Sequence, residues 1–192
     1  EIRSQFETNF FGVQKVTRSA LPLMRATASK SGEDFSTKII NISSVQGRST
    51  LPGLGAYGAS KFALEGFSES LYFEIQPFGI EVVILEPGTY LTKAIDENSH
   101  EADAGLDTDS PYAKYAKRLK DLHSNILITK KGVGDPEDVA IMIEDIINRK
   151  RNKLRYLAGT QAKMRVWMRS ILPFRWFSKI ILKLAMGVNR SN

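Results

Sequence analysis

The sequence predicts an α/β fold in which a parallel sheet carries helices on its faces. Three observations support this prediction: a β-branched run at residues 38–43, helical spacing of apolar residues over 57–75, and a second apolar run at residues 80–85. A strand, a helix and a strand within about fifty residues form one right-handed crossover unit, and such units pair their strands in parallel.

The first 25 residues predict a helix, because apolar side chains recur near the helical period at Ile2, Phe6, Phe10, Val13, Val16, Ala20 and Leu23. A polar loop is expected at residues 29–37. The chain opens on Glu1 rather than Met, in what reads as the middle of a helix. We therefore expect that the natural protein begins further upstream.

Two strands and the helix between them follow this loop. Residues 38–43 read Lys-Ile-Ile-Asn-Ile-Ser, which is typical of a buried strand. The helix over residues 57–75 is stopped by the sequence Pro-Phe-Gly. Residues 80–85 read Ile-Glu-Val-Val-Ile-Leu and predict a second strand, which ends at Pro87 and Gly88.

The stretch from residue 93 to residue 131 is polar and contains Gly105 and Pro111, with modest helical spacing only around residues 112–122. Long connections of this kind often cover a binding site. We therefore expect residues 93–131 to form a lid over a substrate.

The last sixty residues predict helices and one strand. Asp135 followed by Pro136 is a helix start, with a capping carboxylate and a proline in the first turn, and this helix should extend to about Asn148. Residues 154–157 could add an edge strand. Proline separates two amphipathic helices, at residues 162–171 and 174–187.

Composition limits the class of protein. A chain of 192 residues that is 42% hydrophobic and 25% charged predicts one globular domain. The absence of cysteine excludes disulfides and thiolate metal sites, and two histidines, His100 and His123, are too few for a histidine-rich metal site. No run reaches the ~18–20 apolar residues of a membrane span. These features favour a cytoplasmic protein.

Basic residues are concentrated at the end of the chain. The net charge is +6, but residues 146–192 contain 12 Lys or Arg and no Asp or Glu. Within residues 162–187, basic side chains alternate with the aromatic residues Trp167, Phe174, Trp176 and Phe177. One interpretation is a helix pair that closes over the substrate with solvated basic faces; another is peripheral attachment to an anionic membrane. Nucleic-acid binding is not expected, because no recognisable module accompanies the charge.

Tyr57 and Lys61 stand four residues apart and therefore share one face of the predicted helix. This spacing alone is common in helices. However, Ser44 follows the first predicted strand, and the second strand delivers Pro87 and Gly88 to the same edge of the sheet, where α/β proteins bind ligands. The simpler alternative is that Ser44 and Pro87-Gly88 only form turns.

The assembled pattern resembles the classical short-chain dehydrogenase/reductase family. The resemblance extends from Glu1 to about Thr92 and rests on Asn9 in Asn-Phe-Phe-Gly, Ser44 in Asn-Ile-Ser-Ser, Tyr57 and Lys61 in Tyr-Gly-Ala-Ser-Lys, and the run Pro87-Gly-Thr-Tyr-Leu-Thr92. It implies the C-terminal part of a Rossmann-like, doubly wound parallel sheet with helices on both faces. Residues 1–92 would form the catalytic core, 93–131 the lid, and 132–192 the variable end.

The resemblance also implies an oxidoreductase that transfers a hydride between NAD or NADP and an alcohol or carbonyl, with Tyr57 as acid and base. Lys61 would bind the nicotinamide ribose, Ser44 would polarise the substrate carbonyl, and Asn9 would hold a water in a proton relay. Cofactor contacts are implied for Tyr57 and Lys61 and for the segment beneath the nicotinamide, at Pro87, Gly88, Tyr90 and Thr92. A homo-oligomer is implied as well.

The chemistry requires a more acidic phenol than an ordinary tyrosine, whose pKa is near 10. An ammonium about 4 Å away at an effective dielectric of ~20 interacts by ~4 kcal/mol, which could lower the pKa by up to about three units. We therefore expect Lys61 to bring the pKa of Tyr57 toward neutrality.

Two family motifs are missing from this sequence: the glycine-rich turn that binds the pyrophosphate and a later Asn-Asn-Ala-Gly segment. We therefore expect an N-terminally truncated fragment that binds dinucleotide poorly. The leading hypothesis is an enzyme for an apolar substrate, such as a steroid, a retinoid or another lipid-like carbonyl. The alternative is a catalytically incompetent domain that binds a membrane or a partner through its basic helices.

Overall fold

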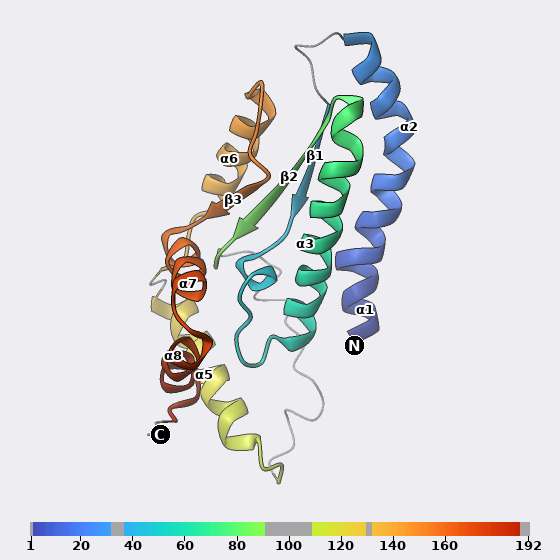
Figure 1. Cartoon of the computed structure of the whole chain (residues 1–192). Coiled ribbons are helices and arrows are strands. Elements are labelled where there is room, and N and C mark those ends of the chain that lie inside the picture. Colours follow the sequence, from blue (N-terminus) through green and yellow to red (C-terminus); the bar gives the residue numbers. More distant parts are fainter. Residues whose placement is uncertain (1, 32–36, 91–108, 130–131, 189–192) are drawn as a thin grey trace.

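A three-stranded parallel sheet lies at the centre of the chain, with strand order β1-β2-β3 (Figure 1). The structure is a computed structural model, and it describes residues 2–31, 37–90, 109–129 and 132–188. The strands are β1 (Thr37–Ile42), β2 (Ile80–Pro87) and β3 (Arg155–Ala158). The predicted α/β class, the parallel pairing and the edge strand are confirmed.

Helices cover both faces of the sheet. The opening helical segment comprises α1 (Ile2–Phe6), a π-helical turn (Glu7–Gly12) and α2 (Val13–Ser31), and it lies beside α3 (Gly55–Ile75) on one face (Figure 1). The core on this side contains Ala28, Leu71, Ile75, Ile80 and Val82. The helix α6 (Pro136–Asn148) covers the other face, where the core contains Val83, Leu85, Tyr90, Ile146 and Ala158.

The strand β2 is buried on both sides, which explains its continuous apolar run. Ile80 and Val82 face α2 and α3, whereas Val83 and Leu85 face α6, and none of the four is more than 1% exposed. Side chains alternate between the faces of a strand, so a central strand of a parallel sheet needs apolar residues at successive positions.

Short helical turns complete the connections. A 3-10 turn, η2 (Val45–Gly47), follows β1, and another, η3 (Gln76–Phe78), ends α3 before Gly79, which adopts a left-handed conformation with φ 72°. The predicted stop after residue 75 is therefore confirmed, although α3 begins two residues before Tyr57.

The C-terminal helices lie beyond the carboxyl ends of the strands (Figure 1). They are α5 (Ala113–Thr129), α7 (Thr160–Ile171), α8 (Phe174–Ile181) and a final π-helical turn, η5 (Leu182–Met186). The predicted pair is confirmed, except that its second helix divides into α8 and η5. The described part of the expected lid is mainly α5, which contacts η5 through a 3.2 Å hydrogen bond from Arg118 Nε to the Ala185 carbonyl. Residues 91–108 and 130–131 lie outside the described residues.

The helix α6 begins where the sequence predicts, and a lysine side chain from β1 holds its end. Asp135 Oδ1 accepts a hydrogen bond of 3.0 Å from the Glu137 backbone at the start of α6. At the other end, Lys38 Nζ donates to the carbonyl oxygens of Ile146, Ile147 and Arg149. A lysine at this position satisfies carbonyls that the helix itself leaves unpaired.

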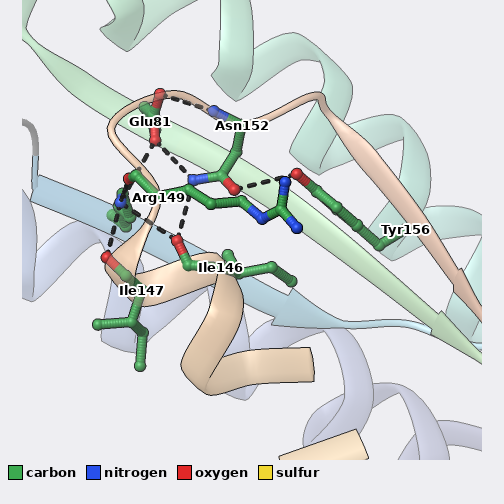
Figure 2. A network of polar contacts seen from close by, with 7 residues as sticks. Glu81, Ile146, Ile147, Arg149, Asn152 and Tyr156 are labelled. Carbon is green, nitrogen blue, oxygen red and sulfur yellow. Dashed lines mark hydrogen bonds and ion pairs between the residues drawn. The ribbon is translucent and has the colours of Figure 1, made fainter. Parts of the chain in front are cut away.

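Asn152 joins this end of α6 to β2 and β3, as Figure 2 shows. Its backbone and side-chain nitrogens donate to the two carboxylate oxygens of Glu81 at 3.1 and 3.0 Å, and the Tyr156 hydroxyl donates to its side-chain oxygen at 3.0 Å. The network lies at the amino ends of the strands, the edge of the sheet opposite the predicted site, so we assign it a structural role.

No described helix is both long enough and apolar enough to cross a bilayer.

Candidate active site

Ser44 links the carboxyl ends of β1 and β2. The β-ladder continues one residue past β1, because the Ser43 backbone donates to the Leu85 carbonyl at 2.8 Å. Ser44 then caps η2, where its Oγ accepts a hydrogen bond of 3.2 Å from the Gln46 backbone. The same hydroxyl donates to the Pro87 carbonyl oxygen at 3.4 Å. The convergence of Ser44 and Pro87 at one edge, expected from the sequence, is present in the structure.

Tyr57 and Lys61 extend from the first two turns of α3 toward this edge. The Ser44 hydroxyl lies close enough to the Tyr57 side chain to lower the pKa of the phenol. Lys61 Nζ lies 5.7 Å from the centre of the Tyr57 ring and donates to the carbonyl oxygen of Ile42, the last residue of β1, at 2.9 Å. Ser44, Tyr57 and Lys61 therefore form one cluster at the ends of β1 and β2.

Asn9 reaches the same part of α3 from the π-helical turn Glu7–Gly12. Its Nδ2 donates to Ser60 Oγ at 3.0 Å, and Ser60 Oγ donates to the Tyr57 carbonyl at 2.8 Å. Ser60 is fully buried. Asn9 is therefore connected, through Ser60, to the helical turn that carries Tyr57 and Lys61. Such π-helical turns occur often at functional sites, but the apolar period of the sequence gives no signal for this one.

The electrostatics of the cluster correct one expectation. Burial raises the pKa of Tyr57 above its ordinary value, and the hydrogen bond from Ser44 lowers it by less. The expected strong lowering by Lys61 is absent; this ammonium lies over the ring, 5.7 Å from its centre, and donates to the Ile42 carbonyl. Burial also lowers the pKa of Lys61 itself, and the nearby charge of Glu65 opposes that effect.

Close packing requires a glycine at position 88, which the sequence did not reveal. Its backbone nitrogen donates to the Ala158 carbonyl at 3.0 Å, and a Cβ atom at this position would lie 3.3 Å from the Cβ of Ala162 in α7. The glycine therefore lets β2 approach β3 and the first turn of α7 closely. This places α7 directly beside the candidate site.

Tyr90 lies in the core rather than in an open site. Its ring is 7% exposed, and a Cβ atom at Gly134 would lie 2.3 Å from it, so this glycine makes room for the ring. Burial raises the pKa of Tyr90. A cofactor contact by Tyr90 would therefore use its backbone. Thr92, the other residue predicted in this segment, lies outside the described residues.

Two buried carboxylates beside the cluster were missed by the sequence analysis. Glu65 on α3 is 5% exposed and Glu86 on β2 is fully buried. Glu86 Oε1 lies 3.1 Å from Arg48 Nη1 and 3.5 Å from Arg155 Nε, and Glu65 Oε2 lies 3.1 Å from the same Arg155 nitrogen. A glutamate at the end of an apolar strand was the available signal, since a buried charge needs a partner.

The fold and the cluster define a class: a Rossmann-like α/β protein with serine, tyrosine and lysine side chains gathered at the carboxyl edge of its parallel sheet. The chain belongs to the short-chain dehydrogenase family, whose model, described as short chain dehydrogenase, matches residues 1–103.

Known relatives agree with this assignment. The chain is 39% identical over 182 residues to an uncharacterized oxidoreductase, YusZ, of Bacillus subtilis, covering 94% of this chain and 61% of the relative. It is 34% identical over 174 residues to a 3-ketodihydrosphingosine reductase of Bacteroides thetaiotaomicron, covering 88% and 60%. A crystal structure of a short-chain dehydrogenase from Streptomyces avermitilis superposes with a TM-score of 0.68 at 30% identity, covering 97% of this chain and 62% of that one. The chain therefore spans about three fifths of the length of these proteins.

Proposed function

We propose that the chain forms the catalytic part of an NAD- or NADP-dependent oxidoreductase that interconverts an alcohol with a ketone or an aldehyde. The observation that carries this proposal is the cluster of Ser44, Tyr57 and Lys61, in which one hydroxyl lies close enough to the phenol to lower its pKa and one ammonium lies over the phenol ring. Family membership supports the enzyme over the alternative of a non-catalytic binding domain.

The donors of the cluster fit a nicotinamide ribose. Lys61 has three N–H donors, one of which is directed to the Ile42 carbonyl, and Tyr57 adds a hydroxyl one helical turn away. These two side chains would hold the ribose, and the backbone around Pro87 and Gly88 would support the ring. The bound nicotinamide would supply or accept the hydride.

The residues of the chain would handle the proton. In carbonyl reduction, Tyr57 donates its phenolic proton to the oxygen that becomes an alkoxide, and Ser44 donates a hydrogen bond to the same developing charge. Burial raises the pKa of Tyr57, so the phenol carries its proton at neutral pH and is available as the donor in reduction, although the higher pKa also makes it a weaker acid. Asn9 would support replacement of the proton through ordered water.

An apolar substrate is supported by the C-terminal helices and by one relative. The first turn of α7 packs against Gly88 at the edge of the site, and the later turns of α7 carry exposed Trp167 and Ile171. The relative from Bacteroides thetaiotaomicron is named as the reductase of 3-ketodihydrosphingosine. We therefore propose a carbonyl attached to a lipid-like chain.

Peripheral contact with an anionic membrane fits the same helices. Trp167, Phe174 and Trp176 are 61%, 65% and 66% exposed, and the exposed basic residues of this segment are Lys163, Arg169, Arg175, Lys179 and Lys183. Arg175, Trp176 and Lys179 line a hollow on the surface of α8. Basic helices with exposed aromatic rings suit the membrane interface.

The reaction class can be tested by following nicotinamide absorbance in an enzyme form that reaches the length of the relatives. Long-chain ketones and aldehydes should be turned over with NADH or NADPH, and more efficiently than short carbonyls of the same reactivity. A short-chain preference would contradict the proposed substrate class. No turnover of any carbonyl with either cofactor would contradict the proposed function.

A further inference from the structure

We propose that Glu65, fixed in place by Arg155, is a positioning residue that stabilises the positive charge of Lys61. The inference rests on the proposed function, which requires a lysine ammonium at this site. It adds a carboxylate and an arginine behind the cluster, and the arginine comes from β3 rather than from the catalytic segments.

Lys61 and Glu65 stand one helical turn apart on α3, and the same loop covers both. Gly47 of η2 lies directly on this turn: a Cβ atom there would be 3.0 Å from the Lys61 carbonyl oxygen and 3.0 Å from Glu65 Cγ. Glu65 is 5% exposed, so water screens its charge poorly. The loop thus keeps the carboxylate in a dry environment, one helical turn from Lys61.

Arg155 prevents Glu65 from turning away. Its Nε lies 3.1 Å from Glu65 Oε2, and its guanidinium also contacts Glu69 on the next turn of α3. Glu65 Oε1 is buried without a hydrogen-bond partner among the described residues. One carboxylate oxygen is therefore anchored, while the other keeps negative charge that nearby hydrogen bonds do not satisfy.

The network around Lys61 contains charges of both signs, which come from several elements. The positive groups of the network are Lys61, Arg48 and Arg155, and the negative groups are Glu65, Glu69 and Glu86. Burial and the neighbouring charge of Glu65 raise the pKa of Glu86, against the opposing effect of the two arginines. Glu86, fully buried, is thus the carboxylate of this pair for which protonation is favoured.

The consequence for Lys61 has a definite sign. Burial lowers the pKa of the Lys61 ammonium, and Glu65 raises it. Without Glu65, the ammonium would lose its proton at a lower pH. A purely structural Glu65–Arg155 pair, which only fastened β3 to α3, would not change the titration of Lys61.

The test is an NMR titration of Lys61 in the present chain, with 13C-labelled lysine and with Lys61→Arg to assign its signal. In Glu65→Gln, the acid dissociation constant of the ammonium should increase by about tenfold. Glu69→Gln is the matched control, because Glu69 contacts the same arginine but is 50% exposed; it should change the constant much less. An unchanged Lys61 titration in Glu65→Gln, or an equal change in Glu69→Gln, would overturn the proposal.

If Glu65→Gln does not fold, as judged by circular dichroism, the double variant Glu65→Gln/Arg155→Gln is compared with Arg155→Gln alone, because the difference between these two variants isolates the loss of the Glu65 charge. The measurement needs no cofactor or substrate. A failure to reduce carbonyls would therefore count against the proposed function, whereas an unresponsive Lys61 would count against Glu65. In the active enzyme, the loss of activity at alkaline pH should begin at a lower pH in Glu65→Gln and not in Glu69→Gln.

Discussion

Ser44 influences the acidity of Tyr57 directly. The hydrogen bond between the two side chains lowers the pKa of the phenol, while burial, the larger effect, raises it. The sequence placed Ser44, Tyr57 and Lys61 at one site, because their order follows from a strand end and a helical turn. It could not predict the direction of the pKa shift, which depends mainly on burial.

Removing the Ser44 hydroxyl should therefore raise the pKa of Tyr57 further. Ser44→Ala loses the hydrogen bond that favours the phenolate, so the phenol should titrate at higher pH than in the unmodified chain. An ultraviolet or NMR titration of Tyr57 measures this change. Ser43→Ala is the matched control, since the neighbouring Ser43 hydroxyl is buried without a hydrogen-bond partner among the described residues. A downward shift in Ser44→Ala, or equal shifts in both variants, would contradict this assignment.

At the scale of helices and strands, local sequence signals predicted most of the structure. The 3.6-residue period located the opening helix, and the signal Asp135-Pro136 located the start of α6. The π-helical turn that holds Asn9 has no such signal. The contacts of Lys38 with the end of α6 span more than one hundred residues and depend on the packed fold rather than on local sequence.

The proposed membrane contact belongs to α7 and α8. The chain should sediment with vesicles that contain anionic phosphatidylserine, less so as salt screens its basic residues, and weakly with neutral vesicles. Trp167→Ser/Trp176→Ser should weaken binding by about tenfold or more, because two exposed rings are lost from the interface.

Phe73→Ser provides the matched control for vesicle binding. Phe73 is 65% exposed, a fraction close to those of the two tryptophans. However, it lies on α3 and outside the basic segment. Its replacement should leave sedimentation unchanged. The membrane proposal would fail if the chain ignored anionic vesicles or if Phe73→Ser weakened binding as much as the double variant.

Across the whole molecule, the sequence predicted the architecture better than the buried charges. Apolar runs define the central strands of the parallel sheet, and the helical period of apolar residues defines its two helical layers. The network of Glu65, Glu86, Arg48 and Arg155 was missed because Arg155 and Glu65 are 90 residues apart and meet only when β3 joins the sheet. The expected homo-oligomer and cytoplasmic location stay predictions, which light scattering and cell fractionation can check.

The central claim is that Tyr57 transfers the proton in a carbonyl–alcohol interconversion. The most direct test compares Tyr57→Phe with the unmodified enzyme, in a form that reaches the length of the relatives, by the rate of nicotinamide oxidation with a reducible ketone. Tyr72→Phe is the control, because Tyr72 lies on the same helix but fifteen residues further along, where it packs against the core. We predict a loss of about 10²- to 10⁴-fold for Tyr57→Phe and no loss for Tyr72→Phe. If Tyr57→Phe folds and keeps most of the activity, the phenol is not the proton donor and the account is wrong.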